Sequence, residues 1–320
     1  MAADTLRPCP RRSPPLEPYA SGMLPVGDGH SIYWETSGNP SGKPALYLHG
    51  GPGGGLRPGY RSRFDPEKYL IIGFDQRGCG HSRPLATHDE TTLATNTTQH
   101  LIADIEALRT HLGVPRWLVN GVSWGTTLAL AYAQAHPSHV SAVVLAATSL
   151  STPECVEWIT ETVGCLFPAE WEAFRSAAAP RPGQRLVDAY YDLLTSADPQ
   201  VRIQAAAAWM AWEDAHVSMG SPYIRKEYDP EWRQVFATLV VHYWKNAGFL
   251  SPTALRDGMP TLHGIPGVLI QGKLDVSSPA GVAWDLHKAW PGSQFVLVDD
   301  EGHGGPKMIQ AMTAAFTELA

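Results

Sequence analysis

The sequence has few cysteines, and their placement argues against both a disulfide-bonded framework and a zinc-binding site. Its 320 residues include four of them, Cys9, Cys79, Cys155 and Cys165, and no two have the CxxC spacing typical of metal ligands. We therefore expect neither a disulfide framework nor a metal site, and a reducing, cytoplasmic compartment fits this composition.

Positive charge is also scarce. Lys and Arg number 24 against 31 Asp and Glu, which gives a formal net charge of -7. Such a surface does not attract nucleic acid or an anionic membrane, so we expect neither as a partner. The first residues are charged and rich in proline, without the apolar segment of a secretory signal.

No long hydrophobic run stands out. A stretch without formal charge lies between Arg116 and Glu154, but Asn120, Gln134 and Pro137 interrupt it. A membrane-spanning helix needs about 20 predominantly apolar residues in a row. We interpret the stretch as a buried strand, turn and helix. Hydrophobic residues make up 44% of the chain, which is enough to form the core of one large globular domain.

Short apolar runs alternate with amphipathic segments in the first half of the chain. Leu101, Ile105, Leu108 and Leu112 recur at spacings of three and four, which predicts a helix over 98–112. Apolar runs that end in Gly- or Asp-containing turns predict strands, and their alternation with helices indicates an α/β fold with a mostly parallel sheet. The expected strands are 31–36, 45–48, 69–74, 117–120 and 140–146, and a second helix is expected over 126–136.

The pattern changes after residue 150. Residues 152–250 are rich in Trp and Ala at helical spacing, whereas 266–271 and 295–298 again have the composition of buried strands. We predict an α/β core formed by 1–150 and 255–320, interrupted by a helical cap at 151–254.

The pentapeptide Gly121-Val122-Ser123-Trp124-Gly125 lies between a predicted strand and a predicted helix. In a nucleophile elbow, two glycines allow a sharp turn that lifts the serine hydroxyl above the edge of the sheet. An ordinary glycine-rich turn is the alternative, but the strand before and the helix after favour Ser123 as a nucleophile.

A serine nucleophile needs a base and an acid that orients the base. Asp275 follows the predicted strand at 266–271, and His303 follows the strand at 295–298. The order serine, acid, histidine is the one that elbow enzymes use. We therefore predict Asp275 and His303 as partners of Ser123, and interpret the competing acids Asp299 and Asp300 as solvated residues at a strand end.

A glycine-rich run, residues 49–55, follows the strand at 45–48. Unobstructed backbone N–H groups there can stabilise an oxyanion. We expect one donor from Gly50 or Gly51 and the other from Trp124. A phosphate-binding loop is disfavoured because GxxxxGK[ST] is absent. The run at 75–82 is expected to brace this loop, and Cys79 within it has no evident base.

The runs at 49–55 and 75–82, together with the pentapeptide 121–125, resemble those of proline iminopeptidase, a family of serine peptidases with the α/β-hydrolase fold. The resemblance implies an α/β-hydrolase core with an inserted helical cap, and removal of an N-terminal proline through an acyl-enzyme without metal or cofactor. It also implies a triad of Ser123, Asp275 and His303. Further similar segments are 17–19, 28–30, 33–35, 96–98, 129–137, 272–275 and 286–291.

The resemblance also implies where the substrate binds. The sequence Trp209-x-x-Trp212-Glu213 matches a motif of the family's cap, which makes Glu213 the candidate anchor for the free amine of a small peptide or amide, with Trp212 beside it. The family carries a second amine-binding glutamate where this chain has Val240.

Because Val240 replaces an amine-binding glutamate of the family, two enzymatic functions remain open. One is the prolyl aminopeptidase, and the other is a related serine hydrolase or acyl-transfer enzyme for a different amide or ester. A non-catalytic binding protein is the third hypothesis, which the presence of Ser123, Asp275 and His303 disfavours.

Overall fold

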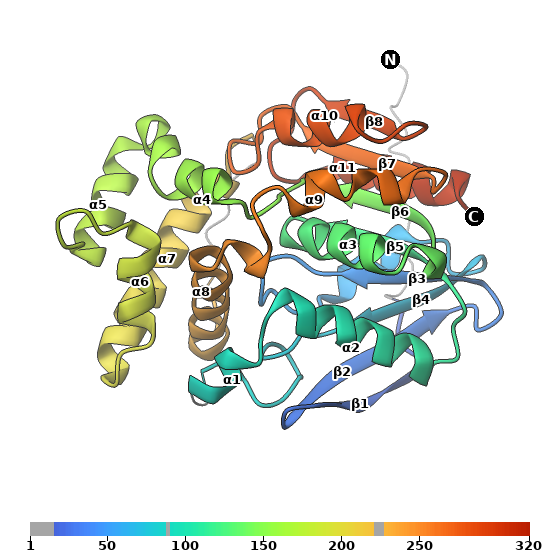
Figure 1. Cartoon of the computed structure of the whole chain (residues 1–320), viewed down its shortest axis with the longest axis horizontal. Coiled ribbons are helices and arrows are strands. Elements are labelled where there is room, and N and C mark those ends of the chain that lie inside the picture. The colour runs from blue at the N-terminus through green and yellow to red at the C-terminus, as the bar shows by residue number, and fades with distance from the viewer. Residues whose placement is uncertain (1–15, 88–89, 221–226) are drawn as a thin grey trace, which may run out of the picture.

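The computed structural model describes residues 16–87, 90–220 and 227–320. Its centre is an eight-stranded sheet with helices on both faces, and a further group of helices lies at one end of the sheet (Figure 1). In chain order the strands are β1 (Ala20–Gly27), β2 (His30–Gly38), β3 (Lys43–Leu48), β4 (Tyr69–Phe74), β5 (Trp117–Val122), β6 (Val140–Ala146), β7 (Gly267–Gly272) and β8 (Gln294–Val298).

The strands lie in the order β1-β2-β4-β3-β5-β6-β7-β8. β1 and β2 form an antiparallel hairpin, and β2 is also antiparallel to β4, whereas every pair from β4 to β8 is parallel. The prediction of a mostly parallel sheet is therefore confirmed. In such a sheet the carboxyl ends of β3, β5, β6, β7 and β8 meet at one edge, which is where these folds bind ligands.

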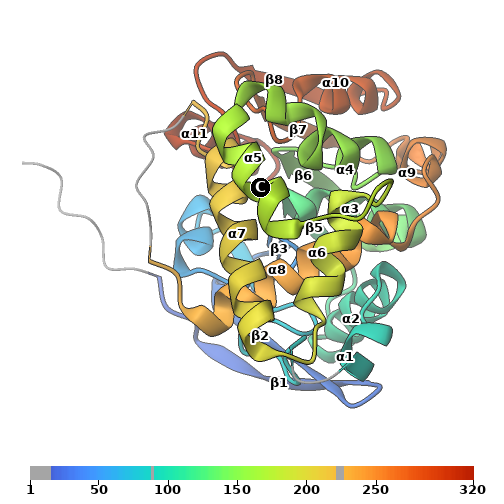
Figure 2. The ribbon, with the colours of Figure 1, turned by 90° about the vertical axis from the view of Figure 1, so that its left-hand side faces the viewer.

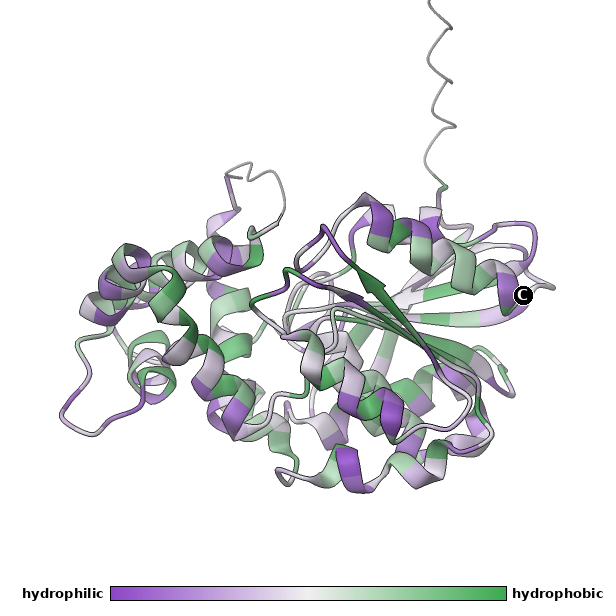
Figure 3. Ribbon diagram, turned by 90° about the horizontal axis from the view of Figure 1, so that it is seen from above, coloured by the Kyte–Doolittle hydropathy of each residue, from purple (hydrophilic) through white to green (hydrophobic). Residues whose placement is uncertain are grey.

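Alternate residues of each central strand enter two separate hydrophobic cores, as the period of two in a strand requires. On β3, Leu46 and Leu48 belong to one core, and Ala45 and Tyr47 belong to the other. Figure 3 shows the apolar strands between more polar helices. Both faces of the parallel strands are therefore apolar, which explains their continuous hydrophobic runs.

Helices cover the two faces of the sheet. α2 (Thr98–His111), α3 (Trp124–Ala135) and α10 (Ala280–Lys288) pack into the first core, and α11 (Pro306–Glu318) packs into the second, next to the 3₁₀ turn Pro58–Arg63. Two shorter helices are α1 (Glu90–Ala94) and α9 (Ala254–Asp257).

Five of the helices described between β6 and β7 form the group at the end of the sheet, in front of it in Figure 2. They are α4 (Pro153–Thr160), α5 (Pro168–Ala178), α6 (Leu186–Leu194), α7 (Pro199–Val217) and α8 (Pro230–Lys245). Phe174 stacks on Tyr190 at 4.5 Å and on Trp212 at 5.3 Å between ring centres, so aromatic packing holds this group together. Within the described part of 152–250 there are only helices and loops.

β1 was not expected from the sequence. It contains Gly22 and Pro25, and its burial alternates between exposed and half-buried residues, as an edge strand allows. The strands that were expected, which correspond to β2–β8, agree with the structure to within two residues at each end. No helix in the described ranges is both long enough and apolar enough to cross a membrane.

Candidate active site

Ser123 occupies the sharp turn between β5 and α3. Its φ of 56° and ψ of -127° are strained for a residue with a side chain. The flanking glycines permit the turn, because a Cβ on Gly121 would lie 2.2 Å from the carbonyl oxygen of Gly125, and a Cβ on Gly125 would lie 2.2 Å from that of Leu48. This is the geometry of a nucleophile elbow.

The structure brings the predicted base and acid to Ser123. The Nε2 of His303 lies 3.0 Å from the Oγ of Ser123, and its Nδ1 lies 3.0 Å from Oδ2 of Asp275. Asp275 is buried and also accepts hydrogen bonds from the backbone N–H groups of Ser277 and Ser278, each at 3.0 Å. The three groups form a hydrogen-bonded chain in which the histidine can accept the serine proton.

The electrostatics of the site support a basic histidine. Burial alone would lower the pKa of His303, but the charge and hydrogen bond of Asp275 outweigh it, and Glu213 adds to them, so the pKa lies above its ordinary value. The competing acids are both exposed and paired with lysines, Asp299 with Lys273 and Asp300 with Lys307.

The glycine-rich loop closes against the elbow. A Cβ on Gly50 would lie 3.0 Å from the Cβ of Ser123, so the backbone approaches the serine there because no side chain intervenes. Gly51 and Trp124 line the same small cavity as Ser123. Their position fits the predicted role of backbone donors around the reacting carbonyl.

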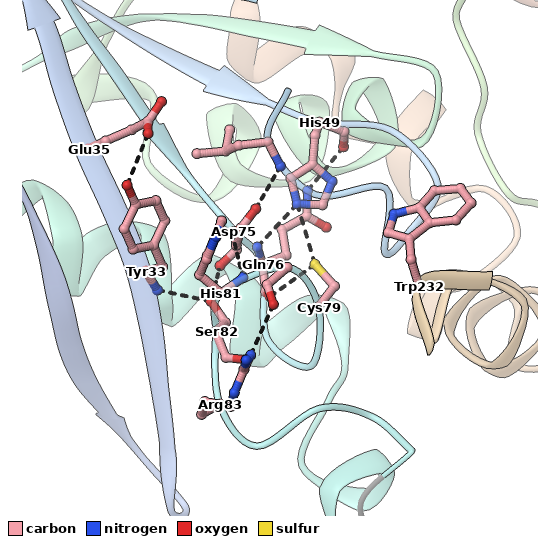
Figure 4. A network of polar contacts seen from close by, with 12 residues as sticks. Tyr33, Glu35, His49, Asp75, Gln76, Cys79, His81, Ser82, Arg83 and Trp232 are labelled. Carbon is pink, nitrogen blue, oxygen red and sulfur yellow. Dashed lines mark hydrogen bonds and ion pairs between the residues drawn. The ribbon is translucent and has the colours of Figure 1, made fainter. Parts of the chain in front are cut away.

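The run 75–82 braces this loop, as expected (Figure 4). The amide of Gln76 donates to the carbonyl oxygen of His49 at 3.0 Å and accepts from the indole N–H of Trp124 at 3.1 Å. Asp75 accepts from the backbone N–H of Leu56 at 2.6 Å. One side chain, Gln76, thus connects the glycine loop to the residue that follows the nucleophile.

One expectation about this run is wrong. The Nε2 of His49 lies 3.6 Å from the Sγ of Cys79, so a base does lie beside the thiol. Both side chains are buried, and burial raises the pKa of Cys79 well above its ordinary value. The thiol therefore stays protonated and acts as a packing group.

The cap contributes two polar side chains to the cavity. Glu213 and His216, both on α7, line it together with Ser123 and His303. Burial raises the pKa of Glu213 to about 7, and the nearby His303 partly opposes that effect. His216 was not singled out in the sequence, although its spacing of three from Glu213 on a helix places both on one face.

The other two predicted substrate-binding residues are not among those that line the cavity. The indole N–H of Trp212 donates to the carbonyl oxygen of Ile159 at 3.2 Å, and the ring packs in the cap core. Val240 is fully buried one turn before Trp244, which does line the cavity. Val240 supplies no polar atom, so the direct contacts predicted for these residues stay predictions.

A possible cation-binding group lies elsewhere. Glu106, His136 and His139 bring ligand atoms within 4.8 Å of one another. Both oxygens of Glu106 already bind Arg109, at 2.9 Å each, and one also accepts from Tyr132. The carboxylate that a metal would need is therefore already paired with a cation.

Comparison with known proteins agrees with this geometry. Residues 43–306 match the family model described as the alpha/beta hydrolase fold. A crystal structure of proline iminopeptidase from Mycobacterium smegmatis superimposes with a TM-score of 0.59 at 19% identity, covering 94% of this chain and 98% of that one. The chain is therefore an α/β-hydrolase.

Curated relatives narrow the class. A probable proline iminopeptidase of Streptomyces coelicolor is 46% identical over 96% of this chain and 97% of its own length. Proline iminopeptidase of Arabidopsis thaliana is 44% identical over 90% of this chain and 76% of its own. The chain belongs to the proline iminopeptidase family.

Proposed function

We propose that this protein is a serine aminopeptidase that releases an N-terminal proline from small peptides. The observation that carries the proposal is one cavity lined by Ser123, by His303, which Asp275 orients, and by the carboxylate of Glu213. A nucleophile beside an anchor for a cationic amine is the arrangement that an exopeptidase needs. The family relationship supports it and does not favour the alternative of a different amide or ester.

The reaction follows from the positions of these groups. Ser123 Oγ attacks the carbonyl carbon of the first residue while His303 Nε2 takes its proton, and Asp275 keeps the other ring nitrogen protonated. His303 then gives that proton to the leaving amine, which departs as the shortened peptide. Water, deprotonated by His303, attacks the resulting ester and releases the free amino acid. Backbone N–H groups of the glycine loop and of Trp124 stabilise the oxyanion in both steps.

Glu213 accounts for the exopeptidase character. Its carboxylate attracts a protonated amine at the N-terminus, and an internal peptide bond carries no such charge. Ile159 and Trp244 add apolar walls to the small cavity, which suits a compact side chain such as a pyrrolidine ring.

A panel of aminoacyl arylamides tests the proposal. The prolyl compound is expected to give the highest kcat/KM, with alanyl and leucyl compounds well below it. A fluorophosphonate should label Ser123 in the same preparation. Labelling without any preference for proline would contradict the proposed substrate while leaving the hydrolase chemistry intact, and no labelling of folded protein would contradict both.

A further inference from the structure

Two buried polar atoms in the active-site cavity lack a hydrogen-bond partner within the described ranges. They are Oε2 of Glu213 and Nε2 of His216, which face each other at 3.8 Å. The side chain of His216 is 1% exposed. A buried polar atom without a partner costs about 1–3 kcal/mol. The pair therefore indicates a ligand with a polar group that reaches both atoms.

The other ring nitrogen of His216 is already engaged. Nδ1 lies 2.7 Å from the Oγ of Ser277, a hydroxyl that can rotate to accept the Nδ1–H. In that tautomer Nε2 carries a lone pair. Burial, together with the nearby positive charge of His303, lowers the pKa of His216 to about 3, although Asp275 acts in the opposite direction. The ring is therefore neutral, and with Nδ1 protonated its Nε2 is an acceptor on the side of Glu213.

We propose that Nε2 of His216 and Oε2 of Glu213 together bind the ammonium group of the substrate, each accepting one of its N–H bonds. This inference rests on the proposed aminopeptidase function and adds a binding residue to it. Two acceptors that flank one nitrogen at about 2.9 Å each lie about 4–5 Å apart. The observed 3.8 Å separation needs only a small rotation of the Glu213 side chain to reach that range.

His216 thus supplies the second acceptor that Val240 does not. Val240 is fully buried and apolar, so α8 offers no second carboxylate at that point. The imidazole enters the cavity from α7 instead, one helical turn after Glu213. A neutral acceptor adds a hydrogen bond without placing a second negative charge beside Glu213.

Two hydrogen-bond acceptors in the cavity favour a secondary ammonium group over a primary one. The ammonium of an N-terminal proline is secondary and has two N–H bonds, one for each acceptor. Every other unmodified N-terminus is primary, and this pair offers no acceptor to its third N–H, which costs about 1–3 kcal/mol when that N–H is buried without another partner. The cavity should therefore prefer secondary ammonium groups, even without a pyrrolidine ring.

N-methylalanine separates this effect from the shape of the ring, because its ammonium is secondary and its side chain is that of alanine. For the unmodified protein, we expect kcat/KM for N-methylalanyl arylamide to exceed that for alanyl arylamide about tenfold. Equal values, or a preference for alanyl, would overturn the matching of two donors to two acceptors.

Two variants of His216 test the residue itself. His216→Gln places an amide oxygen near the position of Nε2, whereas His216→Asn can keep a contact to Ser277 but has no acceptor at that position. The measured quantity is the ratio of kcat/KM for prolyl arylamide to that for p-nitrophenyl acetate, which has no amine. We expect the ratio to fall about 10- to 100-fold in the Asn variant and about threefold in the Gln variant.

The acetate also distinguishes binding from a purely structural role. Ser277 donates its backbone N–H to Asp275, so a His216 that merely positioned this loop would affect both substrates together and leave the ratio unchanged. An unchanged ratio, or an equal fall in both variants, would overturn the proposal while the wild type still cleaved prolyl arylamide. A wild type that hydrolyses acetate but no prolyl arylamide would overturn the proposed function, and this inference with it.

Discussion

The Nε2 of His303 lies 3.0 Å from the Oγ of Ser123, although 180 positions separate the two residues in the chain. β5 delivers the serine and the loop after β8 delivers the histidine, on strands that are separated in the sheet by β6 and β7. Parallel strands place both carboxyl ends at one edge. The loop after β8 then crosses the end of β7, where Leu274 donates its backbone N–H to the carbonyl oxygen of Glu301 at 2.9 Å. This crossing brings His303 to Ser123.

Ser123→Ala removes the nucleophile. We expect kcat for prolyl arylamide to fall by at least about 1000-fold, because the remaining groups can only assist direct attack by water. Ser149→Ala, in another serine that lines the cavity, is the matched control and should lower kcat less than tenfold. Comparable losses in the two variants would show that the reaction does not pass through Ser123.

Asp275→Asn should lower kcat about 1000- to 10,000-fold, because an amide no longer holds the Nδ1–H tautomer of His303. The exposed Asp299, which pairs with Lys273, provides the same chemical change outside the hydrogen-bonded chain. Steady-state kinetics of Asp299→Asn should match the unmodified protein within about threefold. A large loss in Asp299→Asn with little loss in Asp275→Asn would reverse the assignment of the acid.

Gln76→Leu tests the brace under the oxyanion loop. The variant loses the bonds to His49 and Trp124, which lie on the two segments expected to donate to the oxyanion. We expect kcat to fall about 10- to 100-fold with KM changed much less, since the oxyanion forms only during reaction. A change confined to KM would contradict a positioning role.

Glu213→Gln should change how stability depends on pH. The carboxyl of Glu213 has a pKa of about 7 in the folded protein against an ordinary value of 4.5. Between these values the folded state holds a proton that the unfolded state has lost, so stability falls as pH rises through this window, by about 3 kcal/mol in total.

The glutamine removes this titration. Urea unfolding at pH 5 and pH 8 should therefore show a smaller loss of stability in Glu213→Gln than in the unmodified protein. Asp214→Asn, the same change one residue along α7, is the control and should keep most of the pH dependence, because the charge of Asp214 raises the pKa of Glu213 less than burial does. Identical pH dependence in Glu213→Gln and the unmodified protein would place the ionised carboxylate in a solvated environment.

Local patterns were sufficient to predict the catalytic chain and most of the sheet. Buried strands are short apolar runs with glycine or aspartate at their ends, and Ser123, Asp275 and His303 each follow the end of such a strand within five residues. The sequence does not predict β1 because Gly22 and Pro25 interrupt its apolar pattern. A strand at the edge of a sheet tolerates these two residues.

The binding side of the cavity was harder to predict. His216 acquires its place through a contact with Ser277, 61 positions away, and through burial against His303, neither of which leaves a trace in the sequence. Trp212 occurs next to Glu213 in the chain, but successive residues of a helix point in different directions, and its ring packs in the cap core.

The central claim is that this cavity binds a free N-terminal ammonium and delivers the adjoining carbonyl to Ser123. The most direct measurement compares kcat/KM for prolyl arylamide with that for N-acetylprolyl arylamide, which has the same ring and scissile bond without the charge. We predict that the free amine is preferred by at least about 100-fold, as loss of a charged partner for buried Glu213 requires. Equal values for the two compounds would contradict the account.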